Sequence, residues 1–484
     1  MNREFEQLLD KVRREGGEIR SDSREVGKGD IFVAVPGVNA DGARFIPPAV
    51  EAGASTIVCL PGGAEAEAAH AAGCTVVPHD DPREALWRLA EARWHTGSLP
   101  LRVLGVTGTN GKTTSAYLLE HLFTATGHKV GVLGTVSYRW PGHCEAAPLT
   151  TPDPLRVHAM LAAMAQAGVD IAVMEVSSHA LEQQRVCGVP FAGASFSNLT
   201  QDHLDFHQDM ESYFRAKSRL FLELPRADKV MAINGDDPWG RRLLELCPRA
   251  LSFGLQKALP QQRHLWGELL SAGTDGCHLR MHLDGQQWEL RSPLVGAFNA
   301  SNLLSVQALA LELGLMPDDL RHLEDFHGVC GRLERVPNAR KLHVFVDYAH
   351  TPDALVNVLK ALRGAGFKRI VTVFGCGGNR DRTKRPIMGE AVARYSDVAV
   401  LTSDNPRFED PEAILKDVLP GLREAREVVV EVDRRKATAK AVEMLGPDDA
   451  LLIAGKGHED YQIIQGTKHH YSDQEVVREL LGCA

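Results

Sequence analysis

The chain has 484 residues, of which 44% are apolar and 24% charged, and its formal net charge at pH 7 is −9. A single hydrophobic core rarely grows beyond ~250–300 residues, so we expect two to four domains in a protein of ordinary globular composition. The negative charge argues against nucleic-acid binding, and any anionic ligand must therefore be received by a locally basic pocket.

Nine cysteines are scattered along the chain without a Cys-x-x-Cys pair. This spacing is typical of reduced thiols in a cytoplasm and not of a disulfide framework or a zinc ribbon. The first ten residues carry charges throughout, which is unlike a signal peptide. No apolar run approaches the ~18 residues of a membrane span. We therefore expect a cytoplasmic protein without a membrane-spanning segment.

The first 98 residues are expected to form a small α/β domain in which short strands and helices alternate. The strands are expected at residues 31–35, 55–60 and 74–77, and the helices at residues 45–52 and 82–95. Two polar stretches, Ser21–Arg24 and Gly37–Gly42, flank the first of these strands. Their side chains suit a small polar ligand, although residues of this kind are more often ordinary turn residues. Residues 97–100 are expected to form a linker.

Residues 99–332 are expected to form a second domain, and its most informative stretch is Val103–Thr114. Apolar and β-branched residues lead into glycines, and apolar residues recur at helical spacing after Thr113. This pattern predicts a strand, a loop and a helix. The amides of Gly108–Lys112 can face an anion at the helix N-terminus, Lys112 can reach the outer phosphates of a nucleotide, and the Thr113 hydroxyl can hold Mg²⁺.

This loop is a variant of the usual phosphate-binding pattern, which has four residues between its first glycine and Gly-Lys-[Ser/Thr]. Here Gly105 leaves five residues and Gly108 leaves two, which gives Gly-x-x-Gly-Lys-Thr-Thr. An ordinary glycine-rich turn is the alternative. Glycine alone, however, does not explain Lys-Thr-Thr at the first helical turn, so we favour a phosphate-binding loop.

An acidic residue, Glu175, stands close to the end of the expected buried strand Asp170–Val176. In an open α/β sheet the carboxyl ends of the strands form the ligand edge, where the phosphate loop also lies. Glu175 is therefore expected to face the triphosphate, where its carboxylate can ligate Mg²⁺. A purely structural glutamate is the alternative.

Two histidines follow the next expected strand, residues 191–199, at the same edge of the sheet. His203 and His207 are four residues apart, which is the spacing of two zinc ligands on a helix. However, the glutamate of the His-Glu-x-x-His pattern is missing, and a phosphate loop requires magnesium. We therefore expect one histidine to contact the active-site metal and the other to be structural.

The expected helix Met210–Leu222 carries a lysine, Lys217, among aromatic and aliphatic residues. A lysine in such a helix is by default a solvated surface residue. If it instead faced the metal site, burial would lower its pKa. The neutral amine could then take up CO₂ to give a carbamate anion.

Residues 256–293 are expected to add strands to the second domain, and Asn302 opens a helix whose amide side chains could read adenine.

Residues 333–484 alternate strands and helices, which predicts a doubly wound, mainly parallel sheet. The strands are expected at residues 344–347, 370–374, 398–402, 428–432 and 450–453. There is no Gly-x-Gly-x-x-Gly pattern, so nicotinamide binding is not supported.

Polar loops follow four of these strands and should share one edge of the sheet. The loops are Asp347–His350, Gly375–Arg380, Ser403–Arg407 and Gly455–Glu459. We expect them to build a second half-site that faces the nucleotide domain.

Six motifs occur along the chain in one order: Gly-Thr-Asn-Gly-Lys-Thr-Thr, Met-Glu-Val-Ser-Ser-His, Asn-Leu-Thr-x-Asp-His-Leu-Asp-x-His, Gly-Arg-x-Glu, Asp-Tyr-Ala-His and Asp-Asn-Pro-Arg. With them the whole chain resembles the Mur ligases, most closely those that add meso-2,6-diaminopimelate to UDP-N-acetylmuramoyl-L-alanyl-D-glutamate. The resemblance implies an ATP- and Mg²⁺-dependent amide ligase that makes a peptidoglycan precursor in the cytoplasm through an acyl phosphate.

The implied fold is α/β with three domains. These are a UDP-sugar-binding domain at residues 1–98, a central P-loop domain with a mainly parallel sheet at residues 99–332, and a doubly wound, Rossmann-like amino-acid-binding domain at residues 333–484. We expect a monomer with no nucleic-acid partner. The alternatives are a lysine-adding Mur ligase, a folylpolyglutamate synthase, a nucleotide-gated switch without ligase activity, and a kinase.

The resemblance also implies residue roles, which we carry over only where this sequence matches the family motifs. Lys112, Glu175, His203 and Lys217 are implied to be catalytic, with Thr113, Glu175, His203 and a carbamylated Lys217 at the metal. The implied ATP contacts are Gly108, Thr109, Asn110, Gly111, Lys112, Thr113, Thr114, Asn302, Arg332 and Asp347. The implied contacts of the UDP-linked dipeptide are Ser21, Ser23, Val38, Asn39, Ala40, Thr150, Thr151, Ser177, Gln183 and Arg185.

The choice of amino acid depends on its far end, where diaminopimelate carries a second amino-acid head and lysine only an ammonium. Arg407 can pair bidentately with the distal carboxylate, but it would face a lysine cation with nothing to pair. Glu459 suits the distal ammonium. The implied contacts of this ligand are Arg380, Asp404, Asn405, Pro406, Arg407, Gly455 and Glu459.

Overall fold

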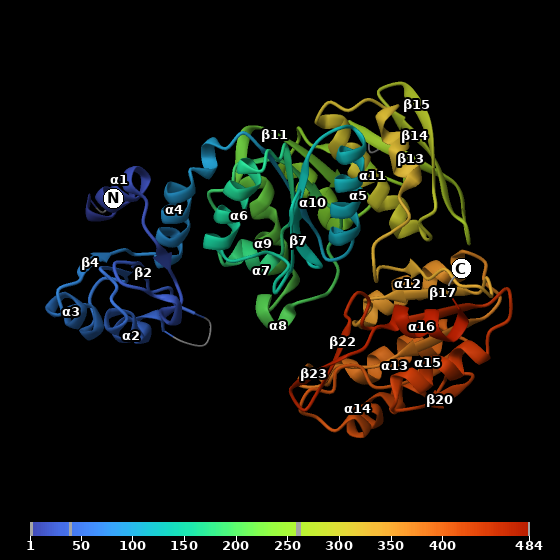
Figure 1. Cartoon of the computed structure of the whole chain (residues 1–484). Helices are drawn as coiled ribbons and strands as arrows, with labels where there is room; N and C mark the ends of the chain where they lie inside the picture. The colour runs from blue at the N-terminus through green and yellow to red at the C-terminus, as the bar shows by residue number, and fades with distance from the viewer. Residues whose placement is uncertain (1–2, 38–40, 258–262, 483–484) are drawn as a thin grey trace. The chain divides into compact units, whose positions relative to one another are not determined.

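The computed structural model describes residues 3–37, 41–257 and 263–482 (Figure 1). The chain divides into two compact units, Met1–Leu251 with Leu309–Gly314, and Ser252–Ala308 with Leu315–Ala484. Among the described residues, no helix is both long and apolar enough to cross a membrane.

The first unit begins with a four-stranded parallel sheet in the order β1-β2-β3-β4. Its strands are β1 (Ile19–Arg20), β2 (Ile31–Val33), β3 (Thr56–Cys59) and β4 (Thr75–Pro78). The helices are α1 (Arg3–Glu15), α2 (Ile46–Glu51), α3 (Ala64–Ala71) and α4 (Pro82–Trp94), with short 3₁₀ turns at Ser23–Glu25, Gly42–Phe45 and Thr96–Ser98. Apolar clusters cover both faces of the sheet. The predicted strands and helices of this part are confirmed within one or two residues.

A second sheet of the first unit runs in the order β11-β10-β5-β9-β6-β7-β8. Strands β5, β6, β9, β10 and β11 are parallel, and β6, β7 and β8 form antiparallel hairpins. The strands are β5 (Arg102–Thr107), β6 (Val130–Leu133), β7 (Ser137–Trp140), β8 (His143–Ala146), β9 (Ile171–Glu175), β10 (Phe191–Phe196) and β11 (Pro225–Asn234). The parallel pairing brings the carboxyl ends of β5, β6, β9 and β10 to one edge.

Six helices accompany this sheet: α5 (Lys112–Ala125), α6 (Pro154–Gln166), α7 (Ser178–Glu182), α8 (Leu204–His207), α9 (Met210–Leu222) and α10 (Pro238–Leu246). Local sequence explains several of their ends. Asp153, Asp209 and Asp237 each accept a backbone N–H in the first turn of the helix that follows, which satisfies a donor that the helix cannot use. Helix α9 has the bounds predicted from its apolar spacing.

The second unit contains β12 (Leu251–Gly254), β13 (His264–Gly273), β14 (Gly276–Leu283) and β15 (Gln286–Ser292). The strands β13, β14 and β15 form an antiparallel meander, and β12 lies parallel to β13. They are followed by α11 (Ala297–Glu312) and a 3₁₀ helix at Asp319–Asp325. The strands predicted within residues 256–293 are therefore confirmed for the described part of that range.

The remainder of the second unit is a six-stranded sheet in the order β16-β17-β21-β18-β19-β20. Its strands are β16 (Glu334–Arg335), β17 (His343–Asp347), β18 (Ile370–Phe374), β19 (Val398–Leu401), β20 (Val428–Val430) and β21 (Ala450–Ala454). Only the β16–β17 pair is antiparallel. A separate hairpin joins β22 (Tyr461–Ile464) to β23 (Thr467–His470).

Helices cover both faces of this sheet. They are α12 (Pro352–Gly364), α13 (Lys384–Tyr395), α14 (Pro411–Val418), α15 (Arg434–Glu443) and α16 (Asp473–Leu481), with a 3₁₀ turn at Leu419–Leu422. Residues of α12, α13 and α14 share one apolar cluster with the sheet, and residues of α15 and α16 share another. Since successive strand side chains point to opposite faces, Phe345 enters the first cluster and its neighbour Val344 the second. The predicted doubly wound arrangement is confirmed.

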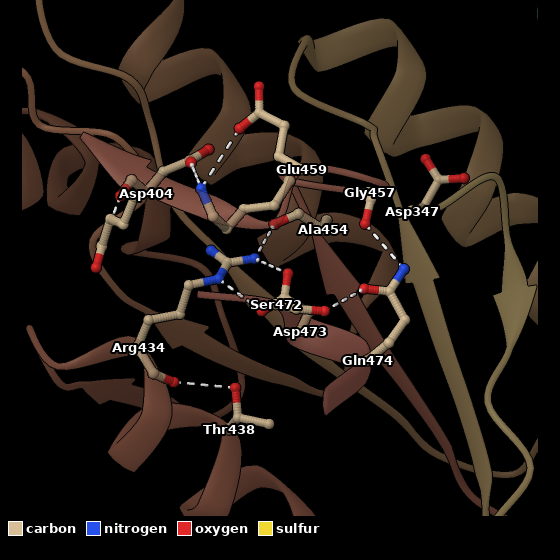
Figure 2. Close-up of polar contacts among 12 residues, drawn as sticks. Asp347, Asp404, Arg434, Thr438, Ala454, Gly457, Glu459, Ser472, Asp473 and Gln474 are labelled. Atoms are coloured by element: carbon tan, nitrogen blue, oxygen red, sulfur yellow. Dashed lines mark hydrogen bonds and ion pairs between the residues drawn. The ribbon is translucent and has the colours of Figure 1, made fainter. Parts of the chain in front are cut away.

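A fully buried ion pair ties α15 and α16 to the end of β21 (Figure 2). Arg434 donates to both carboxylate oxygens of Asp473, with Nε···Oδ1 at 2.9 Å and Nη2···Oδ2 at 2.8 Å. The same Nη2 donates to the backbone oxygen of Ala454 at 2.9 Å. Because Ala454 is the last residue of β21, the pair fixes the origin of the polar loop Gly455–Glu459.

We predict that Asp473→Ala lowers the free energy of unfolding by about 3–5 kcal/mol, because it leaves the Arg434 charge buried without its partner. The matched control is Asp448→Ala, which removes a carboxylate from an exposed pair with Lys368 and should cost at most about 1 kcal/mol. Equilibrium urea unfolding measures both. Equal, small losses in the two variants would contradict the structural importance of the buried pair.

Candidate functional site

The predicted phosphate loop joins β5 to α5 and comprises residues 108–111. Gly108 and Gly111 have φ angles of 149° and 89°, which L side chains rarely adopt. A Cβ on Gly108 would also lie 1.9 Å from Ser197 Oγ at the end of β10. Glycine is therefore required at position 108, because the loop passes directly against the neighbouring strand end.

Residues after β10 hold the backbone of this loop in place. The Asn110 N–H donates to Asn198 Oδ1 at 2.9 Å, and the Thr109 N–H donates to the Asn198 backbone oxygen at 2.9 Å. Ser197 Oγ donates to the Asn110 oxygen at 2.6 Å. Lys112 Nζ lies over the loop and donates to the oxygens of Gly108 and Thr109, both at 2.9 Å. An ammonium and the first amides of α5 thus lie at one place, as anion binding requires.

Glu175 ends β9 and lies beside the first turn of α5. Its carboxylate is fully buried and accepts hydrogen bonds from Thr113 Oγ1, Thr135 Oγ1 and the Thr135 N–H, each at 2.9 Å. Thr135 follows β6, so three strand ends and one helix N-terminus meet here. A carboxylate and a hydroxyl next to a phosphate loop are hard oxygen donors, and this donor set fits Mg²⁺.

Lys217 is buried on α9 with 1% of its surface exposed, so the default expectation of a solvated surface lysine does not apply to it. Its Nζ donates to the Gly108 oxygen at 2.9 Å and lies 4.7 Å from the centre of the Tyr213 ring. Burial lowers the pKa of Lys217 well below its ordinary value, and the charge of Lys112 lowers it further. The neutral amine, which is the form that can add CO₂, is therefore favoured at the phosphate loop.

His203 and His207 lie in different environments although they are four residues apart. His207 is buried, its Nε2 is 2.9 Å from Ser178 Oγ, and its ring stacks on Tyr213. His203 precedes the single turn of α8 in a left-handed conformation with φ 55°, and its ring meets His179 edge-on at 4.8 Å. Across residues 3–37, 41–257 and 263–482, no three His, Cys, Asp or Glu side chains cluster in a way that could hold a metal.

Five of the residues that the resemblance implies for the UDP-linked dipeptide belong to one hydrogen-bonded network, which runs through Thr135 and Glu175. Thr151 Oγ1 donates to the Glu175 backbone oxygen at 2.8 Å and accepts the Ser177 N–H at 3.1 Å. Arg185 donates to the Thr151 oxygen at 3.0 Å and to Gln183 Oε1 at 2.7 Å. The hydroxyl of Thr150 is 3.1 Å from that of Thr135. This network, which comprises Thr150, Thr151, Ser177, Gln183 and Arg185, therefore borders Glu175 directly.

The remaining residues matched to the UDP-linked substrate belong to the first 98 residues. Ser21 follows β1 directly, and Ser23 opens the 3₁₀ turn Ser23–Glu25. Val38, Asn39 and Ala40 lie outside the described residues.

Three residues that the family resemblance implies as ATP contacts lie in the second unit: Asn302, Arg332 and Asp347. Asp347 ends β17 and accepts the N–H groups of Leu333 and Ala349, and its burial raises its pKa. The Arg332 guanidinium lies 4.7 Å from the centre of the Tyr348 ring. Asn302, on α11, donates to Asn299 Oδ1 at 3.2 Å.

The loops after β18, β19 and β21 meet at one edge of the six-stranded sheet. Arg407 has a left-handed backbone with φ 54°, which is held by hydrogen bonds to Ile463 and Gln465 at the β22–β23 hairpin. Its guanidinium donates to the Gly378 oxygen, close to Arg380, at 2.8 Å. Asn405 Nδ2 donates to Glu459 Oε2 at 2.8 Å. The structure therefore brings the residues matched to diaminopimelate together: Arg380, Asp404, Asn405, Pro406, Arg407, Gly455 and Glu459.

Two residues of these sites carry interactions that the sequence analysis did not assign. Thr135 supplies two of the three hydrogen bonds to Glu175, and its position just after β6, at the carboxyl end of a parallel strand, was the available signal. Lys456 lies within the quoted loop Gly455–Glu459 and contacts both Asp404 and Glu459. A lysine between two glycines gives no indication by itself that it is buried.

Strand β5 of the sheet leads into a glycine-rich loop that ends in Lys-Thr-Thr, and a buried carboxylate lies beside this loop. These features define a P-loop nucleotide-binding protein. Three family models match the chain in succession: "Mur ligase family, catalytic domain" at residues 17–94, "Mur ligase middle domain" at residues 106–310, and "Mur ligase, glutamate ligase domain" at residues 331–457. The chain belongs to the Mur ligase family and is an ATP-dependent ligase with the three-domain fold of that family.

Individual relatives agree with this placement. The chain is 55% identical to the UDP-N-acetylmuramoyl-L-alanyl-D-glutamate--2,6-diaminopimelate ligase of Lawsonia intracellularis, over 96% of this chain and 95% of that protein. It is 44% identical to the ligase of the same name from Thermosynechococcus vestitus, over 96% of this chain and 92% of that protein. A solved structure of a ligase with this name matches with a TM-score of 0.68 and 32% identity, covering 96% of this chain and 94% of that chain.

Proposed function

We propose that this ligase adds meso-2,6-diaminopimelate to the D-glutamate of UDP-N-acetylmuramoyl-L-alanyl-D-glutamate in the cytoplasm, at the expense of ATP, and so makes a peptidoglycan precursor. The observation that carries this proposal is the meeting of Arg407, Asn405 and Glu459 on loops that follow two different strands. One guanidinium and one carboxylate at such a place complement an amino-acid head, which carries a carboxylate and an ammonium. The names of the relatives at 44% and 55% identity support it.

The reaction has two chemical steps. The substrate carboxylate attacks the γ-phosphorus of ATP, which gives an acyl phosphate and ADP. The amine of the amino acid then attacks the acyl carbon, and the tetrahedral intermediate collapses to an amide and phosphate. Carboxylate and triphosphate repel one another, so positive charge is needed along the transfer path. The incoming amine must also lose a proton before it can attack.

In this proposal the phosphate loop and α5 bind ATP, with Lys112 at the outer phosphates. Thr113, Glu175 and His203 hold Mg²⁺, and the two hydrogen bonds from Thr135 fix the Glu175 carboxylate at that place. Bound Mg²⁺ supplies charge neutralisation between the triphosphate and the acceptor carboxylate. Asn302, Arg332 and Asp347 complete the nucleotide contacts.

Lys217 acts in this proposal as a carbamate. Its lowered pKa and its position at the Gly108 oxygen support that role, because only the neutral amine adds CO₂. Carbamylation turns this neutral amine into an anion and releases a proton, and the nearby Lys112 ammonium would compensate the new negative charge.

The UDP-linked substrate lies in this proposal along the network that borders Glu175. The Arg185 guanidinium, held by its bonds to Thr151 and Gln183, would offer positive charge to a substrate carboxylate, so the D-glutamate end would approach the phosphate loop. Ser21, Ser23 and residues 38–40 would hold the sugar-nucleotide end. Domains at residues 1–98, 99–332 and 333–484 thus each bring one substrate, and we propose that a monomer suffices.

The proposed function predicts that ADP is released only when ATP, Mg²⁺, the UDP-linked dipeptide and meso-diaminopimelate are all present. A panel of amino acids scored for ADP formation with the purified chain measures this. L-lysine should react at least about a hundredfold more slowly, because its cation would leave Arg407 unpaired. Equal or faster turnover with lysine, or ADP release without any acceptor, would refute the proposal.

Arg407→Ala is predicted to raise the KM for diaminopimelate by about 30- to 4000-fold, because truncating one partner of a hydrogen-bonded charge pair costs about 2–5 kcal/mol. The KM for ATP should not change. Arg426→Ala is the matched control, since that arginine is exposed and pairs with Asp397 on the same sheet. If Arg407→Ala keeps its KM and kcat for diaminopimelate, amino-acid selectivity is set by other residues.

A further inference from the structure

Lys456 is completely buried at the centre of the residues matched to diaminopimelate. Its Nζ is 3.4 Å from Asp404 Oδ1, 3.4 Å from Glu459 Oε2 and 3.2 Å from Asn405 Oδ1. Figure 2 draws dashed lines from the carboxylates of Asp404 and Glu459 to one and the same amino nitrogen. The ammonium therefore bridges the loops that follow β19 and β21.

Further contacts tie these loops to each other and to strand β22. Asn405 Nδ2 donates to Glu459 Oε2 at 2.8 Å, and Gln462 Nε2 donates to the Asp404 backbone oxygen at 2.6 Å. The side chain of Lys456 is 0% exposed, whereas those of Asp404 and Glu459 are 8% and 17% exposed. Glu459 is thus the more exposed of the two carboxylates, Asp404 is nearly buried, and the Lys456 ammonium is not exposed at all.

The charges of this cluster do not cancel. Asp404 and Glu459 together carry two negative charges and Lys456 one positive charge, so one net negative charge is left. The guanidinium of Arg434 also influences Asp404, but it is already neutralised by its bidentate pair with Asp473. On the ligand side, the positive charge of Arg407 lies two residues from Asn405.

This charge balance distinguishes between two kinds of amino-acid side chain. The distal head of diaminopimelate has an ammonium and a carboxylate, which complement one net negative charge and one guanidinium. The side chain of lysine has only the ammonium. If the second negative charge were not cancelled, a bare cation would be attracted more strongly and a head with a carboxylate would be repelled.

We propose that Lys456 is a positioning residue that sets the charge selectivity for the incoming amino acid. It holds Asp404 and Glu459 in place and cancels one of their charges, so that the site accepts a zwitterionic head and rejects a simple cation. This inference rests on the proposed function and assigns to the same site a determinant that does not itself touch the ligand.

The test is Lys456→Met, which replaces the lysine by an unbranched, uncharged side chain one heavy atom shorter. The full-length chain is assayed for phosphate release with ATP, Mg²⁺ and the UDP-linked dipeptide, and kcat/KM is measured for meso-diaminopimelate and for L-lysine. We expect kcat/KM for diaminopimelate, divided by kcat/KM for lysine, to fall at least about tenfold. The main cause should be a higher KM for diaminopimelate, and the KM for ATP should not change. Lys368→Met, which removes an exposed lysine paired with Asp448, should leave the ratio unchanged.

A double variant separates charge balance from loss of packing. Asp404→Asn combined with Lys456→Met restores one net negative charge and should move the ratio back toward the wild-type value. Asp404→Asn alone leaves Lys456 paired with Glu459 and should increase discrimination against lysine, which provides a test even if Lys456→Met does not fold.

Two results would overturn the inference. One is folded Lys456→Met in which kcat/KM for diaminopimelate relative to kcat/KM for lysine is the same as in the wild type. The other is a double variant in which this relative value is no closer to the wild type than it is in Lys456→Met alone. If the wild-type chain released no phosphate with diaminopimelate, the proposed function would fail and this inference with it. An active wild type with insensitive variants would refute only the role of Lys456.

Discussion

The buried carboxylate of Glu175 is the interaction on which the nucleotide site depends. A charged group in the interior is tolerated only when hydrogen bonds or opposite charges compensate it. Thr113 and Thr135 supply three hydrogen bonds, and they come from the helix after β5 and from the end of β6. These donors can converge on Glu175 only because β5, β6 and β9 are parallel neighbours. Sheet topology therefore determines the chemistry at this edge.

The proposed amino-acid half-site in the second unit follows the same principle with different residues. Buried charges are again paired, Arg434 with Asp473 and Lys456 with Asp404 and Glu459. The groups that a ligand would meet are carried on these buried supports and not on independent surface loops. Rigid support of this kind is what a selective site needs, since a charged group that can move aside does not discriminate.

Much of the fold could be predicted from the sequence because its signals are local. The strand before the phosphate loop, helix α9 and the alternating elements of residues 333–484 each follow from apolar spacing, caps and glycines. The burial of Lys217 could not be predicted in this way, because it depends on α9 lying against the end of β5, a contact between residues more than a hundred positions apart. His203 and His207 differ for a similar reason. They are four residues apart, but helix α8 begins at Leu204, so only His207 lies on the helix and His203 precedes it.

For the site residues, too, only those that belong to a local motif could be predicted from the sequence. Gly108, Lys112, Thr113 and Glu175 belong to motifs with a physical reason for each residue, and the structure brings them together. Thr135 and Lys456 lack such a motif, since their roles arise from what the neighbouring strands place next to them. The residues that the resemblance implies for ATP binding are also divided between the two compact units, with Gly108–Thr114 in the first and Asn302, Arg332 and Asp347 in the second.

The most direct test of the account is the response of Glu175→Gln to magnesium. The amide keeps an oxygen that can accept the Thr113 hydrogen bond but removes the charge that the metal requires. We predict that ligation at saturating Mg²⁺ falls at least about a hundredfold, while the affinity for ADP measured without Mg²⁺ is unchanged. Ligation within a few fold of the wild-type rate at the same Mg²⁺ concentration would contradict the account.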